Sequence, residues 1–113
     1  MGLTRTSAWI ARDVWNEAKH RAQDINGVTL DIEIRRLIKL YVEGKVTIQR
    51  DLRPDRDPTR EARKFLPEKT TWDLMKELAK ERDGVSASFA LEFMLWQYGR
   101  GKLILDTDPR IAS

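Results

Sequence analysis

The stretch GVTLDIEIRRLIKLYVEGKVTI, residues 27–48, has a counterpart later in the chain, GVSASFALEFMLWQYGRGKLIL, residues 84–105. The two stretches share one register, because identical residues recur 57 positions apart (72 − 15 for the first pair) without a gap. The identical pairs are Trp15 and Trp72, Lys19 and Lys76, Ala22 and Ala79, Gly27 and Gly84, Val28 and Val85, Tyr41 and Tyr98, Gly44 and Gly101, and Lys45 and Lys102. A constant offset over this length indicates an internal duplication.

The composition is typical of a small, helix-rich globular protein. Charged residues make up 35% of the 113 residues and hydrophobic residues 41%, which fits one domain or two mini-units that bury their apolar faces on each other. There is no cysteine, no run as long as a membrane span and no signal-peptide core. We therefore expect a cytoplasmic or nucleoid-associated protein, without a membrane partner, whose net charge of +3 permits a polyanionic one.

Each copy has the pattern of a helix, a tight glycine turn and a longer helix. In the first copy the pattern predicts an amphipathic helix over residues 12–24, a left-handed stop at Gly27 and a second helix capped by Thr29. The second copy repeats this arrangement, with Gly84 in the turn and Ser86 as the cap. The predicted buried stripes are Trp15, Ala18, Ala22 and Ile25, then Ile34, Leu37, Ile38 and Tyr41, and in the second copy Leu74, Met75, Leu78 and Ala79, then Leu91, Met94, Leu95 and Tyr98.

The last helix carries a further apolar row, formed by Phe89, Phe93 and Trp96. A helix that is apolar over so much of its circumference is buried on more than one side. The row is either part of a larger core or a face for self-association or for a partner protein.

The segments in front of the two helix pairs allow different structures. Residues 3–11 are rich in β-formers and run directly into the first helix, which favours a short strand. Residues 60–67 fit either a second strand or the end of a short helix that starts at Asp57-Pro58 and runs to Ala62. Residues 46–48 and 103–105, which each follow a Gly-Lys pair, could be short strands themselves.

The sequence shows no catalytic motif. It has no Cys/His pair, nucleophile elbow, phosphate-binding glycine loop or metal-spaced cluster, and its single histidine, His20, lies between Lys19 and Arg21 as a solvated residue would. Its acids alternate with basic residues, as on solvated helix faces. We expect a protein that is not an enzyme and has no cofactor, no metal and no small-molecule substrate. The basic residues in segment 49–64 belong to a solvated linker of mixed charge or contact phosphates.

The order of a strand, a helix, a turn and a helix resembles the ribbon-helix-helix family of DNA-binding proteins, which includes Arc repressor. The resemblance rests on TSAWIARDVWNEAKHRAQDINGVTLDIEIRRLIKLYVEGK, residues 6–45, and on FLPEKTTWDLMKELAKERDGVSASFALEFMLWQYGRG, residues 65–101. The matching features are a short strand, the Leu66-Pro67-Glu68 junction, the glycine turn and a Ser/Thr-capped second helix that continues as Glu33-Ile34 in the first copy.

The resemblance implies a mainly α fold with a short β-ribbon, in which two ribbon-helix-helix repeats form a pseudo-dimer within one chain. The repeats would span residues 1–48 and 60–105, joined by an Arg/Asp/Pro-rich linker at 49–59 and followed by a short tail at 106–113. Family members lay a two-stranded ribbon in the DNA major groove and hold phosphates at the N-termini of their second helices. A single copy would lack a partner for its strand and a core for its helices.

Carried onto this sequence, the resemblance predicts the residues that contact DNA. If Ile10 faces inward, Arg5, Ser7 and Trp9 face the groove, whereas a slip of one residue would present Thr4, Thr6 and Ala8 instead. In the second strand, an alignment of Pro67 with Ala11 turns Glu61, Arg63 and Phe65 outward and Lys64 inward. The predicted base contacts are therefore Arg5, Ser7 and Arg63. The predicted phosphate contacts are Thr29, Ser86 and Ser88, with Asp31 opposing a phosphate in the first copy.

The function expected on these grounds is that of a sequence-specific regulator of transcription, of the repressor type, which binds double-stranded DNA and could self-associate on it. The alternative is a related helical module that has lost DNA binding and holds another protein, as an antitoxin or adaptor does. The row of Phe89, Phe93 and Trp96 and the acids of the second strand motivate this alternative.

Overall fold

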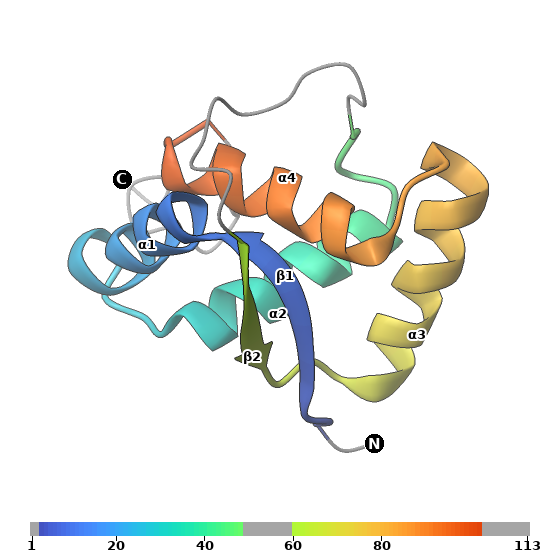
Figure 1. The fold of residues 1–113 in the computed structure, drawn as a ribbon, viewed down its shortest axis with the longest axis horizontal. Coiled ribbons are helices and arrows are strands. Elements are labelled where there is room, and N and C mark those ends of the chain that lie inside the picture. Colours follow the sequence, from blue (N-terminus) through green and yellow to red (C-terminus); the bar gives the residue numbers. More distant parts are fainter. Residues whose placement is uncertain (1–2, 49–59, 103–113) are drawn as a thin grey trace.

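The structure is a computed structural model that describes residues 3–48 and 60–102. It is mainly helical, with one two-stranded antiparallel sheet (Figure 1). The elements are β1 (Thr6–Ala11), α1 (Arg12–His20), the π-helical turn η1 (Arg21–Ile25), α2 (Leu30–Val42), β2 (Arg60–Phe65), α3 (Lys69–Leu78), the π-helical turn η2 (Ala79–Asp83) and α4 (Ala87–Gly99). The same order of elements thus occurs twice, once in residues 3–48, the first half, and once in residues 60–102, the second half.

The turn between the two helices and the cap of the second helix have the same hydrogen bonds in both halves. After η1 the N–H of Val28 donates to the carbonyl of Ala22 at 2.8 Å, and after η2 the N–H of Val85 donates to Ala79 at 3.0 Å. Both turns need a left-handed residue, which the glycines 27 and 84 supply with φ values of 71° and 65°. The caps repeat as well. The hydroxyl of Thr29 accepts from the N–H of Ile32 at 3.4 Å, and that of Ser86 accepts from Phe89 at 3.1 Å.

The strands β1 and β2 pair with each other across the middle of the molecule, with α1 on one side and α3 on the other (Figure 1). Thr6 lies opposite Phe65 and Ala11 opposite Arg60, so that Ser7 faces Lys64. The pairing continues past the strand, where the N–H of Thr4 donates to the carbonyl of Pro67 at 2.9 Å. Segment 60–65 is therefore a strand, and the alternative of a short helix running to Ala62 was wrong.

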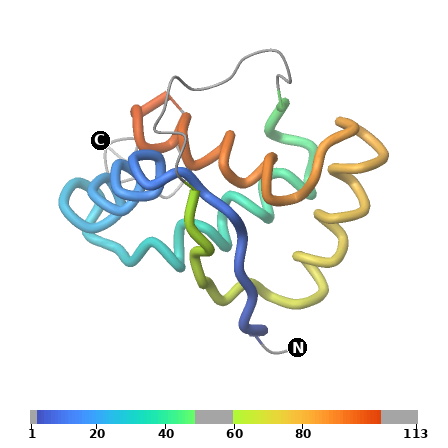
Figure 2. The backbone as a smooth tube through the Cα atoms, in the orientation of Figure 1, coloured from blue at the N-terminus to red at the C-terminus, as the bar shows by residue number. Residues whose placement is uncertain are grey.

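The helices of the two halves alternate in space, as the backbone tube makes visible (Figure 2). The first helix of each half packs against the second helix of the other half, α1 on α4 and α3 on α2, and α2 also meets α4. The buried residues form one cluster that draws on every α-helix and on both strands. Neither half therefore has a core of its own in this arrangement.

The buried stripes of the second helices are as the sequence predicted. The side chains of Ile34, Leu37, Ile38 and Tyr41 on α2, and of Leu91, Met94, Leu95 and Tyr98 on α4, are all buried. The stripes of the first helices were wrong at one position each, because Ile25 is 44% exposed and Leu74 is 43% exposed. The wider π turn moves Ile25 off the inner face. The inner face of α3 passes through Trp72, in place of Leu74, and Met75, and it continues to Ala79 in η2.

The additional apolar row on α4 packs against the core. Phe93 is only 5% exposed, and its ring meets that of Trp96 edge to face at 5.8 Å between centroids. Phe89 and Trp96 are partly buried against the same cluster. For Phe93 the structure thus favours a larger core over a contact face.

Two further predictions concern the ends of the halves. Residues 46–48 are not a strand. Residues 103–105, the linker at 49–59 and the tail at 106–113 lie outside the described residues, as do Arg50, Arg53 and Arg56 of the mixed-charge segment.

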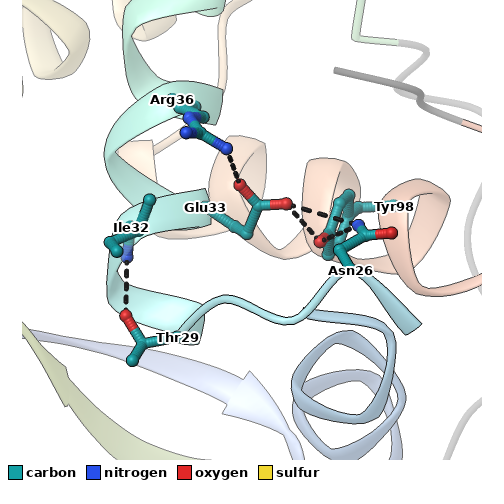
Figure 3. A network of polar contacts seen from close by, with 6 residues as sticks. All are labelled: Asn26, Thr29, Ile32, Glu33, Arg36 and Tyr98. Atoms are coloured by element: carbon teal, nitrogen blue, oxygen red, sulfur yellow. Dashed lines mark hydrogen bonds and ion pairs between the residues drawn. The ribbon is translucent and has the colours of Figure 1, made fainter. Parts of the chain in front are cut away.

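A buried polar network joins the halves at one end of α4 (Figure 3). The hydroxyl of Tyr98 donates to the carboxylate of Glu33, and the amide of Asn26 donates to the hydroxyl of Tyr98 at 2.8 Å. The guanidinium of Arg36 donates to the same carboxylate at 2.8 Å. Because Glu33 is only 1% exposed, these donors offset the cost of burying its charge.

The equivalent contact on the other side uses different chemistry. The hydroxyl of Tyr41 donates to the carboxylate of Asp83, which occupies the position equivalent to Asn26. The guanidinium of Arg82 lies over the Tyr41 ring at 4.5 Å and donates to the Tyr41 carbonyl at 2.6 Å. Burial, together with the hydrogen bond to Asp83, raises the pKa of Tyr41 to about 12.

The raised pKa predicts a loss of stability at alkaline pH. The folded state favours the neutral phenol of Tyr41, so its contribution is fully present below the ordinary pKa of 10.0 and is lost as the pH rises from 10.0 to about 12. Urea unfolding at pH 9, 10 and 11 should therefore show a steeper fall in the free energy of unfolding for the native protein than for Tyr41→Phe. Parallel pH dependences of the two proteins would contradict the assignment.

The crossing of α1 and α4 depends on a glycine. A Cβ atom at Gly99 would lie 3.0 Å from the backbone nitrogen of Ala18 and 3.1 Å from the carbonyl carbon of Glu17. We expect Gly99→Ala to lower the free energy of unfolding by about 1–3 kcal/mol, because the helices must move apart. In a helix without such a contact the same change would raise the free energy of unfolding by roughly 0.5–1 kcal/mol. A fall in the free energy of urea unfolding would therefore support the close contact at Gly99, and a rise would contradict it.

Candidate nucleic-acid interface

The outer face of the ribbon is open to solvent and mixes charged, polar and apolar groups. On β1 the side chains alternate, since Ala8 and Ile10 are buried whereas Ser7 is exposed and Trp9 is 62% exposed. Arg5, just before β1, is exposed as well. The predicted register of this strand is confirmed, and the slip that would have presented Ala8 was wrong.

The predicted orientation of β2 was wrong. Phe65 is buried, with its ring edge to face against Trp72 at 5.3 Å, and the guanidinium of Arg63 lies 5.6 Å from the centroid of the Trp15 ring. Arg63 also pairs with Glu61 at 3.3 Å. Arg63, a predicted base contact, therefore lies on the inner face of the ribbon and not on the face that is open to solvent.

Lys64 and Ala62 take the outward places on β2, and both are exposed. The error came from aligning Pro67 with Ala11. The offset of 57 positions (67 − 10) continues into the strand and aligns Pro67 with Ile10, and both of these residues are buried. The constant offset was thus the signal that would have identified Lys64.

A groove runs between the ribbon and the N-terminus of α4. Its walls include Thr6 and Ser7 from β1, and Ser86 and Ser88 from the α4 end. The α3 side contributes two exposed lysines, Lys76 and Lys80. The free N–H groups and the dipole at a helix N-terminus favour an anion, and lysines on the same groove add to this preference.

The first half has weaker groups at the equivalent positions. Thr29 caps α2 as Ser86 caps α4, but Asp31 takes the place of Ser88 and Gln23 that of Lys80. Lys19 is the only equivalent that keeps its charge (76 − 57 = 19). The carboxylate of Asp31 repels an anion, as the sequence indicated, so the two helix N-termini differ in the ligands that they favour.

Two side chains at equivalent positions of the second helices hold the ribbon to the helices. On α4 the carboxylate of Glu92 accepts from the N–H of Ala11 at 2.8 Å and from the guanidinium of Arg60 at 3.2 and 3.3 Å. On α2 the guanidinium of Arg35 donates to the carbonyl of Leu66 at 2.9 Å. Sequence reasoning missed Glu92, although a single acid within the apolar run FALEFML was a usable signal.

Two features are absent from the part of the chain that the structure describes. Residues 3–48 and 60–102 contain no group of three or more His, Asp or Glu side chains placed to hold a metal ion. No helix within these ranges has the length and apolar character needed to cross a membrane.

Comparisons with known proteins identify no relative. No protein-family model matches the chain, and neither the curated proteins nor the solved structures contain a match.

The role of Glu92 in positioning the ribbon can be tested by its removal. Glu92→Ala leaves the buried N–H of Ala11 without this acceptor and removes the ion-pair partner of Arg60, whose side chain is 36% exposed, so we expect a loss of about 1–3 kcal/mol in the free energy of unfolding. Glu77→Ala, at an exposed position on α3, is the matched control and should stay within about 0.5 kcal/mol of the native protein. Equal effects of the two changes in urea unfolding would exclude the role.

Proposed function

We propose that this protein is a sequence-specific double-stranded DNA-binding regulator, of the repressor type, in which two ribbon-helix-helix repeats act as a pseudo-dimer within one chain. The observation that carries the proposal is the ribbon, whose inner face is covered by helices and whose outer face presents Ser7, Lys64 and Arg5 to solvent. Ser7 and Lys64 are equivalent positions (64 − 7 = 57) that pair directly with each other. This pairing supports a pseudo-two-fold axis through the middle of the ribbon.

A two-stranded ribbon of this kind fits the major groove, where each base pair presents a distinct pattern of donors and acceptors. Lys64 and Arg5 match the acceptors of guanine, and the hydroxyl of Ser7 can donate or accept. Lys64 takes the role first given to Arg63, whose guanidinium instead packs on Trp15. One chain is the DNA-binding unit in this proposal. Chains bound next to each other on DNA could contact one another in addition.

Phosphate contacts at the second-helix N-termini would fix the ribbon in the groove. In the second half the groove of Ser86, Ser88, Lys76 and Lys80 offers N–H groups, hydroxyls and positive charge beside the ribbon. In the first half Thr29 offers the cap alone. Binding through phosphates releases counterions, so the affinity should fall steeply as the salt concentration rises.

Base reading by the ribbon can be measured by fluorescence anisotropy with a duplex taken from the DNA that flanks the protein's own gene. Arg5→Ala and Lys64→Ala should each weaken specific binding by about 1–3 kcal/mol and relax the preference at one position. The matched control is Lys45→Ala, which removes an exposed charge beyond the C-terminal end of α2. If the native protein shows no salt-sensitive binding to any duplex at low ionic strength, the proposal is wrong.

The phosphate contacts predict two changes of opposite sign. Ser88→Asp sets a carboxylate against a phosphate and should weaken binding to all sequences alike, whereas Asp31→Ser removes such a carboxylate and should tighten binding. The slope of the logarithm of affinity against the logarithm of salt concentration should become shallower in the first case and steeper in the second. Changes in the same direction would exclude these two helix ends as equivalent contacts.

The second candidate function is a protein-interaction module, an antitoxin or adaptor that does not bind DNA. The observation in its favour is the apolar character of parts of the ribbon, where Trp9 is 62% exposed, Leu3 51% and Leu66 39%. Contiguous exposed apolar groups are typical of contact with another protein, and Leu3 and Leu66 lie toward the same end of the ribbon. The candidate gains support if Trp9→Ala leaves the fold intact, as judged by thermal unfolding, while salt-sensitive DNA binding is absent in the native protein.

A further inference from the structure

The outward side chains of the two strands differ at every equivalent position. At the offset of 57, Arg5 corresponds to Ala62, Ser7 to Lys64 and Trp9 to Leu66. All six residues are exposed. A ribbon built from two identical strands would present each of these groups twice, in places related by its two-fold axis, whereas this ribbon presents each group once.

The pairing register places these groups along the ribbon in a definite order. Ser7 and Lys64 face each other at the centre, and Trp9 faces Ala62 toward one end. The hydrogen bond from Thr4 to Pro67 continues the register toward the other end, where Arg5 comes opposite Leu66. One end of the outer face therefore carries a guanidinium and the isobutyl group of Leu66, the centre an ammonium and a hydroxyl, and the other end an indole and a methyl group, without a charge.

The charges around the ribbon also differ between its two ends. The groove with Lys76, Lys80 and Ser88 adjoins Thr6 and Ser7, the part of β1 next to Arg5. The equivalent place in the first half carries Asp31. The cationic end of the ribbon thus lies beside the helix N-terminus that favours an anion.

We infer that the DNA target of this protein is not palindromic, with guanine under the Arg5 end and centre of the ribbon and thymine methyl groups under the Trp9 and Ala62 end. The inference rests on the proposed function and concerns the same surface. Arginine and lysine recognise the O6 and N7 acceptors of guanine, and apolar side chains contact the thymine methyl group. A palindrome would repeat one half-sequence under both ends, and at one of the two ends it would meet the wrong side chain.

The cost of that mismatch sets the size of the effect. A good contact to a base edge is worth about 1–3 kcal/mol, which corresponds to roughly 5- to 150-fold in affinity. A target that matches both ends should therefore be bound roughly 5- to 150-fold more tightly than either palindrome built from one of its halves.

Selection from a pool of random duplexes with the full chain, followed by sequencing of the bound fraction, tests the inference. The expected result is an enriched motif that differs from its own reverse complement. A palindromic motif, or salt-sensitive binding without any motif, would overturn the inference while leaving DNA binding itself in place. Absence of binding to every duplex would overturn the proposed function, and the inference with it.

A variant with equal strands sharpens the test. Ala62→Arg, Lys64→Ser and Leu66→Trp together give β2 the outward set of β1, and selection with this variant should return a palindromic motif. Lys64→Ser alone is the matched control, because the two ends of its ribbon still differ and its motif should stay non-palindromic. A triple variant that keeps the native, non-palindromic motif would overturn the inference.

Two single changes keep the test decisive if the triple variant does not fold. Arg5→Ala should relax the preference of the native protein at the guanine end of the motif only, and Trp9→Ala at the thymine end only. Both positions are exposed, so thermal unfolding should remain close to that of the native protein. Loss of preference at both ends in either variant would overturn the assignment of ends.

Discussion

The pairing of β1 with β2 is the constraint on which the rest of the structure depends. Each half contributes one strand, and a single strand leaves its backbone N–H and C=O groups without partners on both edges. Placing Ser7 opposite Lys64 brings the halves together in an antiparallel way. The first helix of each half then lies against the second helix of the other half, and one core forms from both.

The second helices hold this ribbon in place through positions that are equivalent but chemically different. Glu92 accepts from the backbone of β1, and Arg35 donates to the backbone after β2. Side chains of opposite charge thus hold the two strands to the second helices. The tyrosines at the far ends of these helices differ in the same way, with Tyr98 bound to Asn26 and Glu33, and Tyr41 bound to Asp83. Within one chain each half needs to fit only the other half, which permits such differences.

Differences between the halves on the outer face have a different consequence from differences in the core. In the core, one pair of partners can replace another as long as each buried polar group keeps its hydrogen bonds. On the ribbon, the exchange of Ser7 for Lys64 or of Trp9 for Leu66 changes what the surface can recognise. The asymmetry of the ribbon's outer face is thus the feature from which we infer the kind of DNA target that we propose.

The sequence alone determined the features that depend on short-range geometry. The glycine turns follow from the left-handed backbone that Gly27 and Gly84 adopt, and the caps at Thr29 and Ser86 from side chains that reach the N–H three residues on. The buried stripes of α2 and α4 follow from helical periodicity, and the inward face of β1 from alternation. In each case the interacting groups are a few residues apart, so the local sequence pattern is enough to predict the feature.

Only the tertiary structure decided the features that depend on distant residues. The offset of 57 positions aligns Lys64 with the outward Ser7, but the contacts that hold the other face of β2 inward, Phe65 on Trp72 and Arg63 on Trp15, are not revealed by the ambiguous alternation of Arg60–Phe65. The role of Glu92 requires Ala11, 81 positions away in the chain, to lie beside it. The exposure of Ile25 depends on a π turn that helical periodicity does not predict. The contacts of Arg63 with Trp15 and of Glu92 with Ala11 join residues far apart in the chain, and these partners become known only when the halves are packed.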